Sequence, residues 1–339
     1  MHVLLVKTSS LGDIVHSLPA VEDAARHGVR FDWVAEEGYA ALPRLHRSVG
    51  KVIPVAFRRW RKTPVTSLND LFAFRRRLRL DEYDLVIDAQ GLIKSALVGR
   101  WARARDYVGF DQASARERWA STCYSRRVAS RPTSNAIERL RGLFAEAIGY
   151  PVPSSEPQFG IAVDVAQEDY CVLLHGTTWD SKHWPDQFWV DVARRACARG
   201  LKPKLVWGTE SERQRATRLA DAVPEIEVCD AMSLSSVVEL LAKARGVVGV
   251  DSGLAHLSAA LGRPTVVVFG PTDARLTGCP GAHVVNLQGA LACSPCLSDV
   301  CRYRGKAVTW QGEKVEPACF ASVDPQRVFS ELNRLLERD

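Results

Sequence analysis

The sequence predicts an α/β protein with two domains, each built on a parallel sheet. In both halves of the 339-residue chain, short apolar runs alternate with longer stretches of helical periodicity. This alternation is typical of parallel sheets whose two faces are covered by helices. A proline-rich segment, 150–157, lies between the halves and suits an interdomain linker. We therefore expect two Rossmann-like domains that face a central cleft.

The first half should form a domain over residues 1–150. Its expected strands are the apolar runs 3–6, 31–34, 52–55 and 85–87. A helix is expected over 134–148, where Ile137, Leu140 and Phe144 recur at helical spacing. This helix has a polar start at 133–135, and Gly149 follows its end, as at many helix ends.

The second half repeats the pattern and should form a domain over residues 151–325, followed by a C-terminal helix, 326–339. Its expected strands are 171–174, 204–206, 246–250 and 265–269. The helices expected between them are 186–198, 210–222 and 234–244. Ligands of open α/β sheets bind at the carboxyl ends of the strands, so we look for chemistry there.

Charge is distributed unevenly along the chain. The formal net charge of +6 divides into +9 for residues 1–150 and −3 for residues 151–339. A basic first half suits an anionic partner such as nucleic acid, anionic lipid or a phosphorylated or carboxylated substrate. Binding of nucleic acid calls for aromatic stacking platforms among the basic residues, and only Trp60 fits. We therefore expect no nucleic-acid partner, and a basic nucleic-acid-binding protein is kept only as a remote alternative.

Hydropathy favours a cytoplasmic protein. No apolar run reaches the roughly 18 to 20 residues that span a bilayer. The start of the chain has no basic leader or cleavage site, so residues 1–6 are interpreted as a first strand and not as a signal peptide.

The nine cysteines are expected to be mostly reduced in that compartment. Cys293, Cys296 and Cys301 have metal-ligand spacing, but the fourth ligand would have to be the distant Cys319. Ordinary buried or loop thiols are favoured over a structural zinc site, and no metal is assigned.

Asp13 is the first candidate for chemistry. It follows the first strand through the segment 7–12, which ends in Gly12 and contains no Gly-x-Gly-x-x-Gly, so a dinucleotide cofactor is poorly supported. From the residues alone, Asp13 is favoured as a helix cap, although Ser10 could also cap. The alternative is a general base at the cleft, kept ionised by a helix N-terminus.

Basic residues follow the third and fourth strands. Arg58, Arg59, Arg61 and Lys62 surround Trp60 and form either a solvated face or a grip for phosphate and carboxylate groups. Gln90 and Lys94 follow the run 85–87 and could line the same cleft.

In the second half, Lys182 follows Thr177 and Thr178 after a strand, which suits phosphate binding or loop hydrogen bonding. Glu212 could accept both hydroxyls of a ribose, and the start of a surface helix explains it equally well. The strongest local signal is Asp251-Ser252-Gly253-Leu-Ala-His256, where a strand ends and a helix opens. The amides of such a terminus form an anion site, and His256 would lie about one turn inside it.

These segments resemble the ADP-heptose:lipopolysaccharide heptosyltransferases. The similarity spans most of the chain and includes the segments 7–19, 31–38, 55–62, 88–94, 182–185, 251–256 and 270–273. The basic run 58–62 is particularly similar to heptosyltransferase I. That enzyme transfers L-glycero-D-manno-heptose from ADP-heptose to the inner Kdo sugar of Kdo-lipid A during synthesis of the lipopolysaccharide core.

The resemblance implies a GT-B fold and an inverting transfer that needs no metal and no cofactor. It implies that Asp13 is the base that deprotonates the acceptor hydroxyl and that Lys182 steadies the leaving diphosphate. Residues implied around the donor are Thr177, Thr178, Lys182, Glu212, Met232, Asp251, Ser252, Gly253 and His256. Residues assigned to the acceptor side are Ser10, Gly12, Arg58, Arg59, Arg61, Lys62, Gln90, Lys94 and Arg116. The partners would be ADP-heptose, Kdo-lipid A and, peripherally, the inner face of the inner membrane.

One segment departs from this pattern. The stretch with Cys293, Cys296 and Cys301 is more similar to heptosyltransferase II, which acts on the first heptose. That alternative acceptor stays open. We favour type I because acceptor choice should lie in the N-terminal half, where the type I segments occur.

Overall fold

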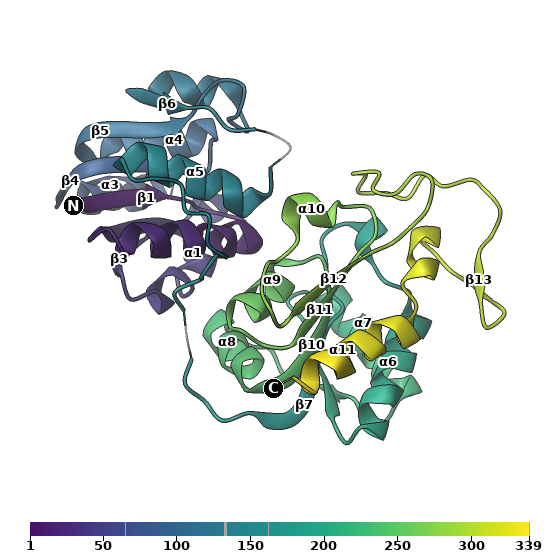
Figure 1. The fold of residues 1–339 in the computed structure, drawn as a ribbon. Helices are drawn as coiled ribbons and strands as arrows, with labels where there is room; N and C mark the ends of the chain where they lie inside the picture. Colours follow the sequence, from purple (N-terminus) through teal and green to yellow (C-terminus); the bar gives the residue numbers. More distant parts are fainter. Residues whose placement is uncertain (65, 132–133, 162, 339) are drawn as a thin grey trace. The chain divides into compact units, whose positions relative to one another are not determined.

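The computed structural model describes residues 1–64, 66–131, 134–161 and 163–338. The chain divides into two compact units, Met1–Ala162 and Val163–Asp339, and each contains a six-stranded sheet (Figure 1). The strands of each sheet pair in parallel. The α/β class with two Rossmann-like units is therefore confirmed. Thr133, expected at the polar start of a helix, lies outside the described residues.

The first unit has the strand order β3-β2-β1-β4-β5-β6. Its strands are β1 His2–Val6, β2 Arg30–Glu36, β3 Val49–Val55, β4 Glu82–Asp88, β5 Arg103–Phe110 and β6 Arg126–Val128. Its helices are α1 Leu11–Ala25, α2 Phe57–Lys62, α3 Leu68–Leu78, α4 Ile93–Trp101 and α5 Ala136–Ile148. The order reverses between β1 and β4, and such a switch point is where doubly wound sheets bind ligands.

The second unit repeats this topology with the order β12-β11-β10-β7-β8-β9. Its strands are β7 Glu168–Leu174, β8 Lys202–Leu205, β9 Glu227–Val228, β10 Ala244–Val250, β11 Thr265–Phe269 and β12 Val284–Gln288. Its helices are α6 Asp186–Ala198, α7 Glu210–Ala222, α8 Leu234–Lys243, α9 Gly253–Ala260, α10 Ala274–Thr277 and α11 Pro325–Leu336. The switch point lies between β7 and β10.

A small hairpin of β13 Thr309–Trp310 and β14 Glu313–Lys314 follows β12. No helix among the described residues is long and apolar enough to cross a membrane.

Apolar side chains from the sheets and their helices form the core of each unit. In the first unit, α1 packs with α5, and α4 packs against β1, β4 and β5. Phe74 of α3 and Tyr83 of β4 belong to the buried cluster on the side of α3 and α4. In the second unit, Trp184, Phe188 and Trp189 are fully buried, and the Trp184 ring packs edge-on against each of the other two rings.

The orientation of Trp60 differs from the sequence interpretation. We considered it as an aromatic stacking platform among basic residues. Its ring instead packs edge-on against Phe57 and Phe74 and joins the core cluster. The exposed positions of α2 are the cations around it, because the helix turns both of its aromatic residues, Phe57 and Trp60, toward the core cluster.

Candidate active site

Asp13 lies at the switch point of the first sheet, in the first turn of α1 after β1. Its carboxylate accepts hydrogen bonds from the Ser10 amide and the Ser10 hydroxyl, each at 2.8 Å through Oδ2. The second oxygen faces the Lys7 ammonium at 3.5 Å. The capping contact is therefore present, and it leaves the side chain 36% exposed, so a substrate can reach it.

The charge state of Asp13 follows from these contacts. Burial alone would raise its pKa, but the Lys7 ammonium and the hydrogen bonds from Ser10 outweigh burial and lower the pKa to about 2. Lys7 is itself only 5% exposed and donates to the Ala89 carbonyl at 3.0 Å. Asp13 is thus ionised at neutral pH and able to accept a proton.

Gln90 connects the loop after β4 to the loop after β1. It is buried, and its side-chain oxygen accepts from the amides of Thr8 at 3.0 Å and Ser9 at 3.1 Å. These amides directly precede Ser10. Gln90 therefore positions the segment that holds Asp13, a role that its assignment to the acceptor side did not include.

Asp88 organises the loop that carries Gln90. It is fully buried at the end of β4 and accepts from the Gln90 amide at 2.8 Å, the Ser95 hydroxyl at 2.9 Å and the Tyr124 hydroxyl at 2.8 Å. Burial raises the pKa of Asp88, and these hydrogen bonds oppose the rise. Sequence reasoning noted Asp88 within a motif and missed this role, because its partner Tyr124 is distant along the chain.

The cations assigned to the acceptor side lie on loops and helices that follow the strands of the first sheet. Arg58 is exposed and donates to the Tyr39 hydroxyl at 2.9 Å. Arg59 pairs with Glu37 and Asp70, so its charge is partly neutralised. Arg61 and Lys62 are exposed and form no ion pair with the residues that the structure describes.

Two further predicted cations approach the same edge of the sheet. Lys94 opens α4, is exposed, and lies over the Phe57 ring at 5.1 Å. Arg116 is exposed on the loop after β5, and the next residue, Glu117, donates its amide to the Gly91 carbonyl at 2.9 Å. The fold thus places both residues beside the loop of Gln90.

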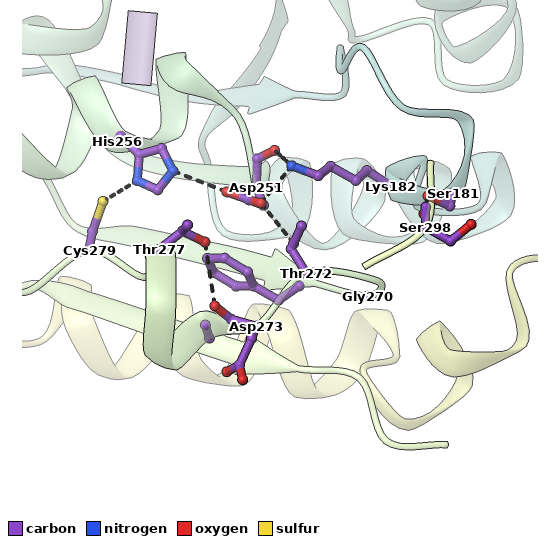
Figure 2. Close-up of polar contacts among 12 residues, drawn as sticks. Ser181, Lys182, Asp251, His256, Gly270, Thr272, Asp273, Thr277, Cys279 and Ser298 are labelled. Carbon is purple, nitrogen blue, oxygen red and sulfur yellow. Dashed lines mark hydrogen bonds and ion pairs between the residues drawn. The ribbon is translucent and has the colours of Figure 1, made fainter. Parts of the chain in front are cut away.

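Asp251 is the centre of a polar cluster at the end of β10 (Figure 2). Its carboxylate accepts from the Lys182 ammonium at 2.7 Å and from the Thr272 hydroxyl at 2.7 Å. The His256 ring lies 3.0 Å away through Nε2, and Nδ1 faces the Cys279 sulfur. Lys182 reaches Asp251 from the short turn η4, Asp180–Lys182, which follows β7. The chain after the switch-point strands β7 and β10 therefore supplies Lys182, Asp251 and His256. Thr272 and Cys279 come from the chain after β11.

This cluster is strongly ionic. Burial raises the pKa of Asp251, but the His256 and Lys182 contacts outweigh it and hold the pKa well below its usual range. For His256, burial lowers the pKa, whereas the Cys279 sulfur and the Asp251 carboxylate raise it, to about 10. Two cationic groups therefore surround one buried carboxylate, beside the start of α9.

The start of α9 has the features of an anion site. Ser252 is its N-cap and Gly253 its first residue, so backbone amides point away from the helix at this end. The Ser252 hydroxyl oxygen is buried and has no hydrogen-bond partner within the described ranges. A buried hydroxyl without a partner is costly, and a phosphate oxygen could satisfy it.

The remaining predicted donor residues occupy loops and helix starts of the second unit. Thr177 and Thr178 lie between β7 and η4, and Met232 precedes α8. Glu212 accepts from the amides of Gly208 at 2.8 Å and Thr209 at 2.9 Å, which is the helix-start contact that we considered. Binding of a ribose by Glu212 stays a prediction.

Thr272 and Cys279 are members of the cluster that sequence reasoning did not select. Thr272 stood in a segment that follows a predicted strand, and this position was an available signal. Cys279 had none, because it lies 23 positions from His256 and no motif joins the two residues.

Comparison with known proteins identifies the family. Residues 71–307 match Glycosyltransferase family 9 (heptosyltransferase). The chain belongs to this family. It is 45% identical to the lipopolysaccharide heptosyltransferase 1 of Pseudomonas aeruginosa, with 99% of this chain and 98% of that protein covered.

Solved structures of heptosyltransferases have the same fold as this chain. The E. coli heptosyltransferase WaaC with ADP is 43% identical and superimposes with a TM-score of 0.79, covering 86% of this chain and 94% of that chain. The E. coli ADP-heptose lps heptosyltransferase II has a TM-score of 0.74 with coverage of 100% and 99%, but is 20% identical and shows the fold alone. The family 9 chain described here is thus a glycosyltransferase with a GT-B type fold.

Proposed function

We propose that the chain is a heptosyltransferase of the first type, which transfers L-glycero-D-manno-heptose from ADP-heptose to the inner Kdo of Kdo-lipid A. The main support is the identity of 45% with the lipopolysaccharide heptosyltransferase 1 of Pseudomonas aeruginosa over 99% of this chain. The lipopolysaccharide heptosyltransferase 2 of E. coli is 26% identical over 46% of this chain. The ionised Asp13 of the first unit and the cationic cluster of the second provide the two chemical functions that transfer needs.

In this proposal Asp13 removes the proton of the acceptor hydroxyl as that oxygen attacks the anomeric carbon from the face opposite the leaving ADP. Configuration is therefore inverted. Lys182 and the amides at the start of α9 stabilise the negative charge that develops on the diphosphate. These groups supply the positive charge that a metal ion provides in other nucleotide-sugar enzymes, so the transfer is proposed to need no metal and no cofactor.

The acceptor is proposed to meet the first unit. Arg58, Arg61 and Lys62 are exposed cations, and arginine can bind carboxylate and phosphate with two parallel hydrogen bonds. Kdo carboxylates and lipid A phosphates are anions of this kind. Replacing Arg58 and Arg61 by glutamine should raise the KM for acceptor and leave the affinity for ADP unchanged. A fall in ADP affinity instead would contradict the division of labour between the units.

Contact with the inner face of the inner membrane is proposed to be peripheral. On α3, Leu68 and Phe72 are 52% and 64% exposed, and Arg75 and Arg76 are exposed on the same helix. Apolar and basic side chains together favour an anionic bilayer surface. Phe72→Ser should reduce cosedimentation with phosphatidylglycerol vesicles, and equal sedimentation of both proteins would contradict this role.

The deciding experiment measures ADP release from ADP-heptose with two defined acceptors. One is lipid A bearing Kdo, and the other already carries the first heptose. Release with the first alone is expected. Release with the second alone would support heptosyltransferase II activity, and release with neither would reject the heptose donor.

A further inference from the structure

Four of the nine cysteines lie around one cavity of the second unit. The cavity has a volume of about 400 Å³ and is lined by Cys293, Cys296, Cys301 and Cys319. The first three come from the chain between β12 and β13, and Cys319 comes from the turn η5, Ala318–Ser322. Sequence spacing alone left Cys319 too distant to count as a fourth ligand. The fold brings Cys319 to the same cavity as the other three cysteines, so its distance along the chain does not argue against it as a ligand.

The chain that carries three of these cysteines has no regular structure of its own. Residues 289–308 form neither helix nor strand, and irregular loops of this length are uncommon in compact domains unless they are functional or disordered. Cys293 and Cys296 are exposed and therefore contribute little apolar burial. Hydrophobic packing is thus a weak source of order here, and a cross-link would provide a stronger one.

The side chains around the cavity suit a metal ion held by sulfur. Cys319 is buried, and a thiol that coordinates a metal ion loses its proton. Four thiolates around a divalent ion leave two negative charges, and Arg302 and Arg304 line the same cavity and can balance them.

We propose that Cys293, Cys296, Cys301 and Cys319 bind one divalent metal ion with tetrahedral thiolate coordination, with zinc as the expected ion. The four residues line the cavity without yet forming a ligand set, since no three of their sulfurs lie within 4.8 Å of one another in the part of the chain described. Zinc–sulfur bonds of about 2.3 Å would draw them closer. Binding therefore contracts the loop and releases the thiol protons.

The loop is joined to the turn that carries Lys182. The Ser181 amide donates to the Asp299 carbonyl at 3.0 Å, and its hydroxyl donates to the Ser298 carbonyl at 2.6 Å (Figure 2). Ser181 directly precedes Lys182. An ordered loop thus holds η4 in place, and a metal distant from the reacting atoms would position Lys182. This consequence, unlike the metal site itself, rests on the proposed function.

The test measures metal content first. Protein purified with reductant, without chelator and without a metal-binding tag should contain about one zinc per chain by elemental analysis. Cys293→Ser and Cys319→Ser should lose it, whereas Cys197→Ser, a partly buried thiol on α6, should keep it. Cobalt substituted into the parent protein should give thiolate charge-transfer absorption and the visible bands of tetrahedral cobalt.

Further outcomes test the metal site separately from the proposed function. One iron per chain that requires the same cysteines would still support the tetrathiolate site. Metal far below one equivalent, with all four thiols reacting freely with a thiol reagent in the folded parent protein, would overturn it even if the variants did not fold. Weaker ADP binding after metal removal is expected. Failure to bind ADP with the metal present would count against the proposed function alone.

Discussion

Asp13→Asn separates the capping contact of Asp13, which the structure shows, from its proposed role as general base. In the parent protein the Ser10 amide donates to Asp13 Oδ2 at 2.8 Å. The side chain of asparagine retains one oxygen, which can still accept this hydrogen bond. The loss of stability should therefore stay below about 1 kcal/mol, the usual value of a cap. Loss of the general base should lower kcat by roughly 10²–10⁴-fold, which corresponds to about 2.7–5.4 kcal/mol in the activation barrier.

The assay compares three quantities in the parent and Asp13→Asn proteins: kcat for ADP release with acceptor, the affinity for ADP, and the thermal midpoint. We expect kcat alone to change greatly. A midpoint that falls sharply, or turnover close to that of the parent, would refute the role as base and leave Asp13 as a cap.

Lys7→Met is the companion variant, because Lys7 makes the largest contribution to lowering the pKa of Asp13. Without that ammonium, the pKa of Asp13 should rise from about 2, and the acidic limb of kcat/KM should move to higher pH. If the acidic limb of kcat/KM stays at the same pH in the variant, Asp13 is not the group that titrates.

The remaining predictions concern the supports of the site. Gln90→Leu leaves the amides of Thr8 and Ser9 without their acceptor, so the protein should lose about 2 kcal/mol or more of stability, measured by denaturant unfolding. Gln90→Glu retains an acceptor and is the control. Lys182→Met should lower kcat with only a modest change in acceptor KM, and an unchanged kcat would contradict its role at the diphosphate. The raised pKa of His256 means that its ion pair stabilises fully below its unfolded pKa of about 6.5. This stabilisation is lost as pH rises toward about 10, so the thermal midpoint should fall over that range. His256→Phe should make the thermal midpoint depend less on pH.

Much of the fold could be predicted because buried parallel strands are nearly continuous apolar runs. The helices α6 and α7 have the predicted bounds, Asp186–Ala198 and Glu210–Ala222. Of the strands in the two six-stranded sheets, β5, β6, β9 and β12 were missed. Strand β5 begins with Arg103, Ala104 and Arg105, which are exposed, and β9 has only two residues, so neither shows a run of apolar side chains.

The site was predictable where a polar residue directly follows a strand. Asp251 is of this kind, and Asp13 follows at the next helix. Contacts that depend on chain segments far apart were not predictable. Examples are Tyr124 with Asp88, Cys279 with His256, and Cys319 with the loop that carries Cys293, Cys296 and Cys301. No local pattern in the sequence encodes which distant segments the topology brings together.

The ion pair between Lys182 and Asp251 has a consequence for inhibitor chemistry. A ligand that draws the ammonium away must carry enough negative charge to compete with a buried carboxylate. Asp251 then keeps the Thr272 hydroxyl and the His256 ring, so it is not left without compensation. Uncharged mimics of the diphosphate cannot make this exchange and should bind poorly. Compounds designed against the proposed diphosphate site should therefore retain an anionic group that can pair with Lys182.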